Sequence, residues 1–105
     1  MGSIPKRYTD FIQKYPYLAN AYRSLGEAAS KAGPLDDKAA ALVKLALAIG
    51  ARMEGAVHSH THKARDAGAS DDEIRHAALL ATTTLGFPTM MAAVSWIEDV
   101  LKEGD

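Results

Sequence analysis

The residues best suited to chemistry are concentrated between positions 54 and 62. Glu54, His58, His60 and His62 all lie in this stretch, which therefore holds three of the four histidines of the chain. Imidazole groups titrate near neutral pH, so they can act as general acids or bases, and neutral imidazoles also bind metal ions. The stretch follows Gly50, a residue that favours a helix end, so we expect it to form the first turns of a new helix.

His60 is the candidate for proton transfer. On a helix it shares a face with Ala56 and Ala64, which lie four residues to either side. A general acid or base at this position would move a proton to or from a small carbonyl compound or its enolate. The alternative interpretation is a histidine held in a helix interface, with its ring satisfied by a backbone carbonyl. The sequence leaves both interpretations open.

A second pattern in the same stretch suggests a metal site. Glu54, His58 and His62 recur every four residues and would form one stripe along the helix. Carboxylate and imidazole groups are ligands for divalent transition metals, and the remaining ligands would come from elsewhere in the molecule. The alternative is a solvated face on which Glu54 pairs with a protonated His58.

The rest of the chain reads as helical, without the alternation of apolar and polar residues that marks a strand. We expect helices near residues 5–15, 16–32, 36–49, 53–68, 70–85 and 88–101, with the first beginning near Pro5. Asp36 or Asp37 can cap the helix over 36–49, and Ser70 and Glu73 have the spacing of a capping box. The helix over 36–49 is apolar nearly all round, which predicts the central and most buried helix. The threonines at 82–84 are expected to return their hydroxyls to carbonyls four residues back.

Short connections between such helices favour antiparallel packing of neighbours. We therefore expect an all-α fold, a compact bundle of five to six helices. We interpret residues 1–105 as a single domain, with an N-terminal helical arm over 1–34 and a core over 35–105.

Composition narrows the classes of function. The chain has 105 residues, 24% of them charged, and a formal net charge of −1, which argues against a nucleic-acid partner. It contains no cysteine, which excludes disulfides, thiolate catalysis and iron–sulfur clusters. No apolar run reaches the roughly 20 residues that span a bilayer, so no membrane partner is expected. The first residues lack the apolar segment of a signal peptide, so a cytoplasmic location is expected.

From Leu35 onward, several landmarks follow one another in a characteristic order. They are Leu35-Asp36-Asp37-Lys38, the helix end Leu45-Ala46-Leu47-Ala48-Ile49-Gly50, His60-Thr61-His62-Lys63-Ala64, Ala67-Gly68-Ala69-Ser70-Asp71-Asp72-Glu73-Ile74 and Leu85-Gly86-Phe87-Pro88. In this order and spacing they resemble the carboxymuconolactone decarboxylase and AhpD-like superfamily, over about two-thirds of the chain. The resemblance implies an AhpD-like all-α fold and a homo-oligomer, such as a trimer or hexamer.

The same resemblance shows which catalytic groups are missing. The superfamily's thiol peroxidases carry a C-x-x-C pair at the start of the fourth helix, a histidine four residues later and a glutamate on the preceding helix. In this chain the histidine falls at His60, the cysteines at Met53 and Ala56, and the glutamate at Ala41. Without a thiol the peroxidase mechanism is excluded.

The decarboxylases of the superfamily need no cysteine, and this chain resembles them in the retained His60 and in the later Gly86-Phe87-Pro88 break. They tend to carry a glutamate four residues before the histidine, where this chain has Ala56. The nearest carboxylate, Glu54, is six residues before His60, which places it on another face of a regular helix.

Three functions follow as hypotheses. The first is proton transfer on a small carboxylated or lactone-like substrate by His60, helped by Glu54 and His58 and with no cofactor expected. Arg52 would be the better anchor for an acidic substrate. His76 could face the same cleft, but the favoured interpretation is a partly exposed histidine on the flank of its helix. The second is a non-catalytic, oligomeric binding or structural protein that has kept the fold. The third is metal binding through Glu54, His58 and His62.

Overall fold

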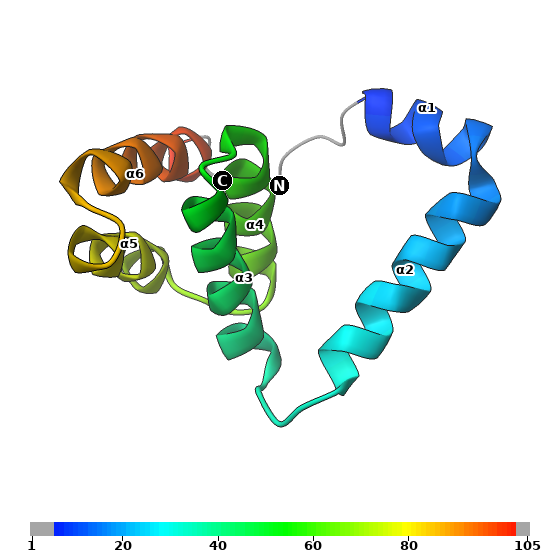
Figure 1. Cartoon of the computed structure of the whole chain (residues 1–105), viewed down its shortest axis with the longest axis horizontal. Helices are drawn as coiled ribbons and strands as arrows, with labels where there is room; N and C mark the ends of the chain where they lie inside the picture. Colours follow the sequence, from blue (N-terminus) through cyan, green and yellow to red (C-terminus); the bar gives the residue numbers. More distant parts are fainter. Residues whose placement is uncertain (1–5, 103–105) are drawn as a thin grey trace. The chain divides into compact units, whose positions relative to one another are not determined.

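The computed structural model of the chain describes residues 6–102. Within this range there are six α helices and one short 3-10 turn, and no strand, which confirms the predicted all-α fold with its five to six helices (Figure 1). The chain divides into two units, one ending at Leu35 and the other beginning at Asp36. Pro5, the predicted start of the first helix, lies outside the described residues. None of the described helices is long and apolar enough to cross a membrane.

The first unit contains helices α1 (Lys6–Lys14) and α2 (Pro16–Lys31). Pro16 occupies the first turn of α2, where a missing backbone N–H leaves no helical hydrogen bond unmade. The two helices meet at Tyr15, whose ring centroid lies 5.5 Å from that of Phe11. Among the residues described in this unit only Ala19 is buried. This unit therefore has almost no core of its own.

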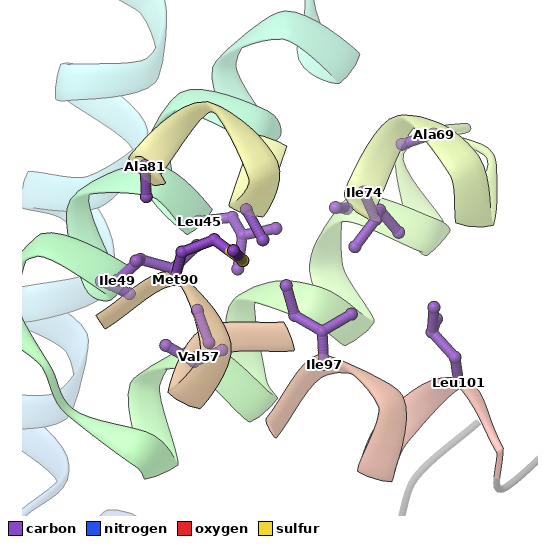
Figure 2. Packing of buried hydrophobic residues seen from close by; sticks show 13 residues of the cluster. Leu45, Ile49, Val57, Ala69, Ile74, Ala81, Met90, Ile97 and Leu101 are labelled. Atoms are coloured by element: carbon purple, nitrogen blue, oxygen red, sulfur yellow. The ribbon is translucent and has the colours of Figure 1, made fainter. Parts of the chain in front are cut away.

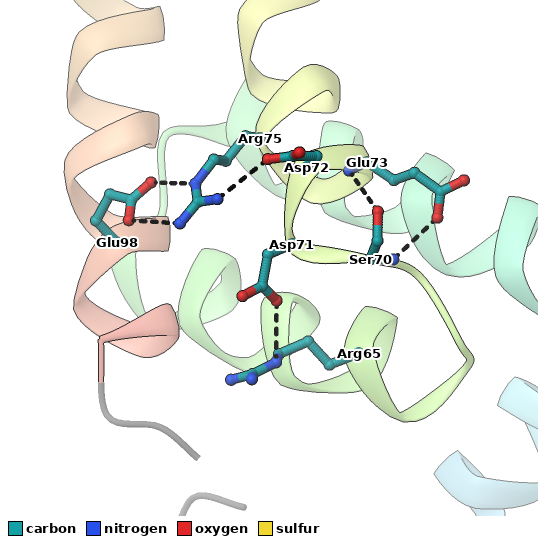
Figure 3. A network of polar contacts seen from close by, with 7 residues as sticks. All are labelled: Arg65, Ser70, Asp71, Asp72, Glu73, Arg75 and Glu98. Atoms are coloured by element: carbon teal, nitrogen blue, oxygen red, sulfur yellow. Dashed lines mark hydrogen bonds and ion pairs between the residues drawn. The ribbon is translucent and has the colours of Figure 1, made fainter.

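The second unit contains α3 (Asp37–Ala51), α4 (Glu54–Asp66), α5 (Asp71–Leu79), the 3-10 turn η1 (Leu80–Thr83) and α6 (Phe87–Leu101). Helix α3 is capped by Asp36, one of the two aspartates that the sequence offered, since the backbone N–H of Ala39 donates to Asp36 Oδ1 at 2.8 Å. The predicted capping box of α5 is also confirmed (Figure 3). Glu73 N donates to Ser70 Oγ at 3.0 Å, and Ser70 N donates to Glu73 Oε1 at 2.9 Å.

Helix α5 is shorter than predicted, because it changes into the tighter 3-10 turn η1 after Leu79. Thr82 Oγ1 donates to the carbonyl of Leu79 at 2.6 Å, and Thr84 Oγ1 donates to that of Leu80 at 3.4 Å. For Thr84 this is the predicted bond to the carbonyl four residues back. Hydroxyls that compete for these carbonyls favour the tighter 3-10 turn over a continuing α helix.

The hydrophobic core lies in the second unit (Figure 2). The residues with no or almost no exposed surface include Leu45, Ile49, Val57, Ile74 and Ile97, drawn from α3, α4, α5 and α6. Their side chains interdigitate where these helices meet, and burial of such side chains is the main stabilising contribution in a small domain.

The prediction that the helix over 36–49 is the most buried is wrong. Helix α6 has five buried residues, whereas α3 has three, Leu45, Ala48 and Ile49. Leu47, on another side of α3, is 68% exposed. The helix packs on α4, α5 and α6 along one side, so an apolar composition all round does not make it central.

Ion pairs tie α5 to its neighbours at the surface (Figure 3). Arg75 forms a two-pronged pair with Glu98 of α6, at 2.7 Å and 3.2 Å, and also contacts Asp72. Arg65 of α4 lies 3.4 Å from Asp71. The hydrogen bonds from Arg75 hold the pKa of the Glu98 carboxyl below its usual value. These contacts hold α5 against α4 and α6 at the surface of the bundle.

Candidate functional site

A sharp corner between α3 and α4 positions the histidine-rich stretch. Arg52 adopts a left-handed conformation with φ of 57°, and its N–H donates to the carbonyl of Ile49 at 2.9 Å, which closes α3. Its guanidinium Nε donates to Thr89 Oγ1 at 3.2 Å. Arg52, expected as an anchor for a substrate anion, therefore holds the corner against the first turns of α6. Helix α4 starts at Glu54, as the sequence predicted to within a residue.

His58 lies between two carboxylates. Its Nε2 is 3.3 Å from Asp99 Oδ2 on α6 and 3.8 Å from Glu54 Oε2, one turn earlier on α4. One ligand atom from each of the three side chains lies within 4.8 Å of the others. Within residues 6–102 neither Glu54 nor Asp99 forms an ion pair with a lysine or arginine. The cluster therefore carries excess negative charge even when His58 is protonated.

The structure brings together two of the three predicted metal ligands and replaces the third. Glu54 and His58 meet as their four-residue spacing predicted, but His62 is not part of the group, which is completed by Asp99 instead. Asp99 follows His58 by 41 residues, and it reaches the ring because α6 packs against α4. Nothing in the local sequence around Asp99 marks it as a partner of His58.

His60 lies on the other side of α4 from this cluster. Two residues correspond to about 200° of helix rotation, so His60 and His58 face nearly opposite directions. The imidazole of His60 is half-buried. Burial, followed by the positive charges of Lys63 and of Lys44 on α3, lowers the pKa of His60 below 6.5. These influences favour the neutral form of the ring, and two of them are the charges of nearby lysines.

The positions that hold thiols and a glutamate in the superfamily's peroxidases are apolar here in three dimensions as well. Ala41 and Ala56 are partly buried and pack against the core, and Met53 is 59% exposed at the start of α4. None of the three side chains offers a group that could exchange a proton or attack a substrate. Of the four peroxidase positions, His60 alone keeps a chemically competent side chain.

A separate groove lies between α3 and the α5–η1 segment. Its volume is about 480 Å³, and most of its lining is apolar, from Leu42, Val43, Ala46, Ile49, Ala77, Leu80, Ala81 and Leu85. Glu73, His76 and Thr84 also line it. His76 is exposed on α5, in line with the favoured interpretation from the sequence. His60 does not line this groove, so the groove is not a cleft that the two histidines share.

Comparison with known protein families identifies a family for most of the chain. The sequence profile described as "Carboxymuconolactone decarboxylase family" matches residues 16–99. The chain belongs to this family. The match begins at α2 and extends through nearly all of α6, so it includes the histidine-rich helix and the groove.

A curated relative of this family member gives no further indication of activity. It is described as "Uncharacterized protein" from Haemophilus influenzae and is 38% identical over 61 residues, which are 58% of this chain and 54% of the relative. The chain thus spans about half the length of the curated relative that it matches.

Proposed function

We propose that this member of the carboxymuconolactone decarboxylase family catalyses proton transfer on a small carboxylated or lactone-like substrate, with His60 as the general base. The observation that carries the proposal is the half-buried His60 imidazole near Lys44 and Lys63. A neutral imidazole can accept a proton at neutral pH without first losing one.

The two lysines give the proposed site its preference for anions. The same positive charges that lower the pKa of His60 would attract a carboxylate and would stabilise the negative charge that develops when a proton leaves the adjacent carbon. Because His60 is half-exposed and does not line the groove beside α5, the pocket would be completed by a second copy of the chain, in line with the expected homo-oligomer.

The roles expected for Glu54 and His58 change within this proposal. Both lie a third of a turn or more around α4 from His60, at about 120° for Glu54 and about 160° for His58 by helix geometry. That Glu54 and His58 assist His60 stays a prediction. It would require an assembly in which these residues of one chain approach His60 of another.

Deuterium exchange offers a test that needs no knowledge of the full reaction. Small carboxylic acids and lactones with a proton next to the carbonyl would be incubated with the protein in heavy water and followed by proton NMR. We expect exchange with wild type and its loss in His60→Gln, since glutamine cannot accept the proton. His76→Gln, which changes an exposed histidine elsewhere, is the matched control.

Two outcomes would count against the catalytic proposal. Unchanged exchange in His60→Gln would show that another group takes the proton. Absence of exchange with every compound would favour the non-catalytic alternative, in which the fold is kept for binding or for assembly.

A second candidate function, binding of a divalent metal ion, is favoured by the Glu54, His58 and Asp99 cluster. Two carboxylates and one imidazole are a ligand set used by zinc and similar ions, and their excess negative charge would be compensated by a cation. Solvent or a further chain would supply the remaining ligands.

Calorimetric titration of tag-free protein with Zn²⁺ distinguishes the two versions of this metal site. If Asp99 completes the site, Asp99→Asn and His58→Gln should each weaken binding by about tenfold or more, whereas His62→Gln should leave it unchanged. If His62→Gln weakens Zn²⁺ binding and Asp99→Asn does not, the ligands are Glu54, His58 and His62, as predicted from the sequence. No stoichiometric binding by wild type would reject the metal function.

A further inference from the structure

Three ion pairs between helices of the second unit follow one pattern. In each, a lysine or arginine of one helix pairs with a carboxylate of another: Lys38–Glu73, Arg65–Asp71 and Arg75–Glu98, at 3.1, 3.4 and 2.7 Å. They join α3 to α5, α4 to α5 and α5 to α6, and Figure 3 shows the last two. Lysine and arginine side chains keep their positive charge at neutral pH, so each of these contacts holds a permanent cation.

The contact between α4 and α6 is bridged differently. Here the paired side chain is His58, whose Nε2 lies 3.3 Å from Asp99 Oδ2 on α6 and 3.8 Å from Glu54 Oε2 on α4. A histidine is charged only when it is protonated, and two carboxylates share this one ring. Among the ion pairs that join helices within residues 6–102, this is the one without a lysine or arginine. The α4–α6 contact therefore has excess negative charge and no permanent cation.

The positions of the three side chains suit a divalent cation. Zinc binds carboxylate oxygen and imidazole nitrogen at about 2.0–2.2 Å, so two ligand atoms on a tetrahedral ion lie about 3.4 Å apart. The two separations from His58 Nε2, 3.3 Å and 3.8 Å, are close to this value. Glu54 and His58 lie on successive turns of α4, so the helix sets their relative position, and only Asp99 comes from another helix.

The surroundings of the cluster favour a structural role for such an ion. The side chains of Glu54 and Asp99 are 57% and 56% exposed. None of the three residues lines the groove beside α5, and His60 faces away from them on α4. An ion at this position would meet solvent rather than the groove or the proposed base. Its contribution would be to hold two helices together.

We propose that a divalent cation bound by Glu54, His58 and Asp99 is the structural bridge between α4 and α6, in the place that lysine or arginine takes in the other contacts. The inference rests on the metal-binding function proposed above and adds the role of the ion. Glu54 is the first residue of α4, and Asp99 lies in the last turn of α6. The ion would therefore fix these two helix ends against each other.

Amide hydrogen exchange measures whether the ion holds the two helix ends. The N–H of Val57 donates to the carbonyl of Met53 at 3.0 Å in the first turn of α4. The N–H of Lys102 donates to the carbonyl of Glu98 at 2.9 Å at the end of α6. In tag-free protein treated with chelator, addition of Zn²⁺ to about 100 times its dissociation constant should slow exchange at both amides about tenfold or more, because opening then requires release of the ion. The amide of Ala40, at the start of α3, should keep its rate.

Two neighbouring carboxylates of α6 provide matched variants for this experiment. Asp99→Asn removes a ligand, and Glu98→Gln removes the partner of Arg75 with the same change of charge. The slowing of exchange by Zn²⁺ should disappear in Asp99→Asn and persist in Glu98→Gln. The reverse result would place the ion elsewhere on α6 and would overturn the proposal.

A permanent cation in place of the ion gives an independent test. His58→Arg brings a guanidinium to the two carboxylates, and His58→Gln is the uncharged comparison. Without metal, the unfolding equilibrium constant of His58→Arg in urea should be about two to five times smaller than that of His58→Gln, the range expected for an ion pair at the surface. His58→Arg should not respond to Zn²⁺, because its bridge already holds a cation. Circular dichroism checks that both variants keep their helices.

The results separate the bridge from metal binding itself. Stoichiometric Zn²⁺ binding in calorimetry, without slower exchange at Val57 and Lys102, would overturn the bridge and leave the metal-binding function in place. Absence of stoichiometric binding would reject both. A His58→Arg variant no more stable than His58→Gln would show that the α4–α6 contact does not need a cation, and would also overturn the bridge.

Discussion

At the scale of single residues, the chain has kept a base and lost the nucleophiles around it. His60 is the candidate base that the resemblance indicates, and burial together with the charges of Lys63 and Lys44 lowers the pKa of its ring. Met53 and Ala56 stand where thiol chemistry would need cysteines. Without a cysteine, the chain offers no thiol nucleophile at these positions.

The lowered pKa of His60 has a consequence for stability. An unfolded histidine takes up its proton near pH 6.5, whereas folded His60 does so at lower pH, so the unfolded chain binds more protons in that window. The contribution of His60 to stability should therefore be fully present above pH 6.5 and should be lost as the pH falls towards the folded pKa.

Urea unfolding on either side of pH 6.5 measures this effect. We expect His60→Gln to reduce the pH dependence of the unfolding free energy, and His76→Gln serves as the matched control. If His60→Gln keeps the full wild-type dependence, His60 does not have the environment described here.

At the scale of elements, the helix ends are set by local contacts. Asp36 caps α3, and Ser70 and Glu73 close a reciprocal pair of hydrogen bonds at the start of α5. Each cap satisfies backbone N–H groups that have no partner inside the helix. The capping box also begins the segment that carries Glu73 and His76 to the groove, so it contributes to the shape of that groove.

Removal of the Ser70 hydroxyl should measurably destabilise the start of α5. Ser70→Ala is expected to lower the unfolding free energy by about 1 kcal/mol, since Glu73 N then loses its side-chain acceptor. Ser95→Ala, at an exposed position inside α6, should change it by less than about 0.5 kcal/mol. Equal values for the two variants in urea unfolding would contradict a stabilising capping box.

At the scale of the whole molecule, the distribution of apolar residues is uneven. The second unit buries a continuous core, whereas the first unit leaves Leu18, Tyr22 and Leu25 uncovered and has one buried residue in its described part. An exposed apolar surface of this kind marks an interaction site in a globular protein.

The sequence by itself determined the features that depend on neighbouring residues. Helix periodicity, the Asp36 cap and the Ser70–Glu73 box are local, and so is the meeting of Glu54 with His58 one turn apart. The order of the motifs was also sufficient to predict the family.

Only the tertiary structure decided which surfaces meet. Asp99 reaches His58 across 41 residues because α6 packs on α4. Leu47 is exposed because α3 packs along one side only, although its composition predicted burial all round. Local pattern cannot supply such information, because the partner of a helix face is chosen by the packing of the whole bundle, in which residues far apart in the chain compete for the same contact.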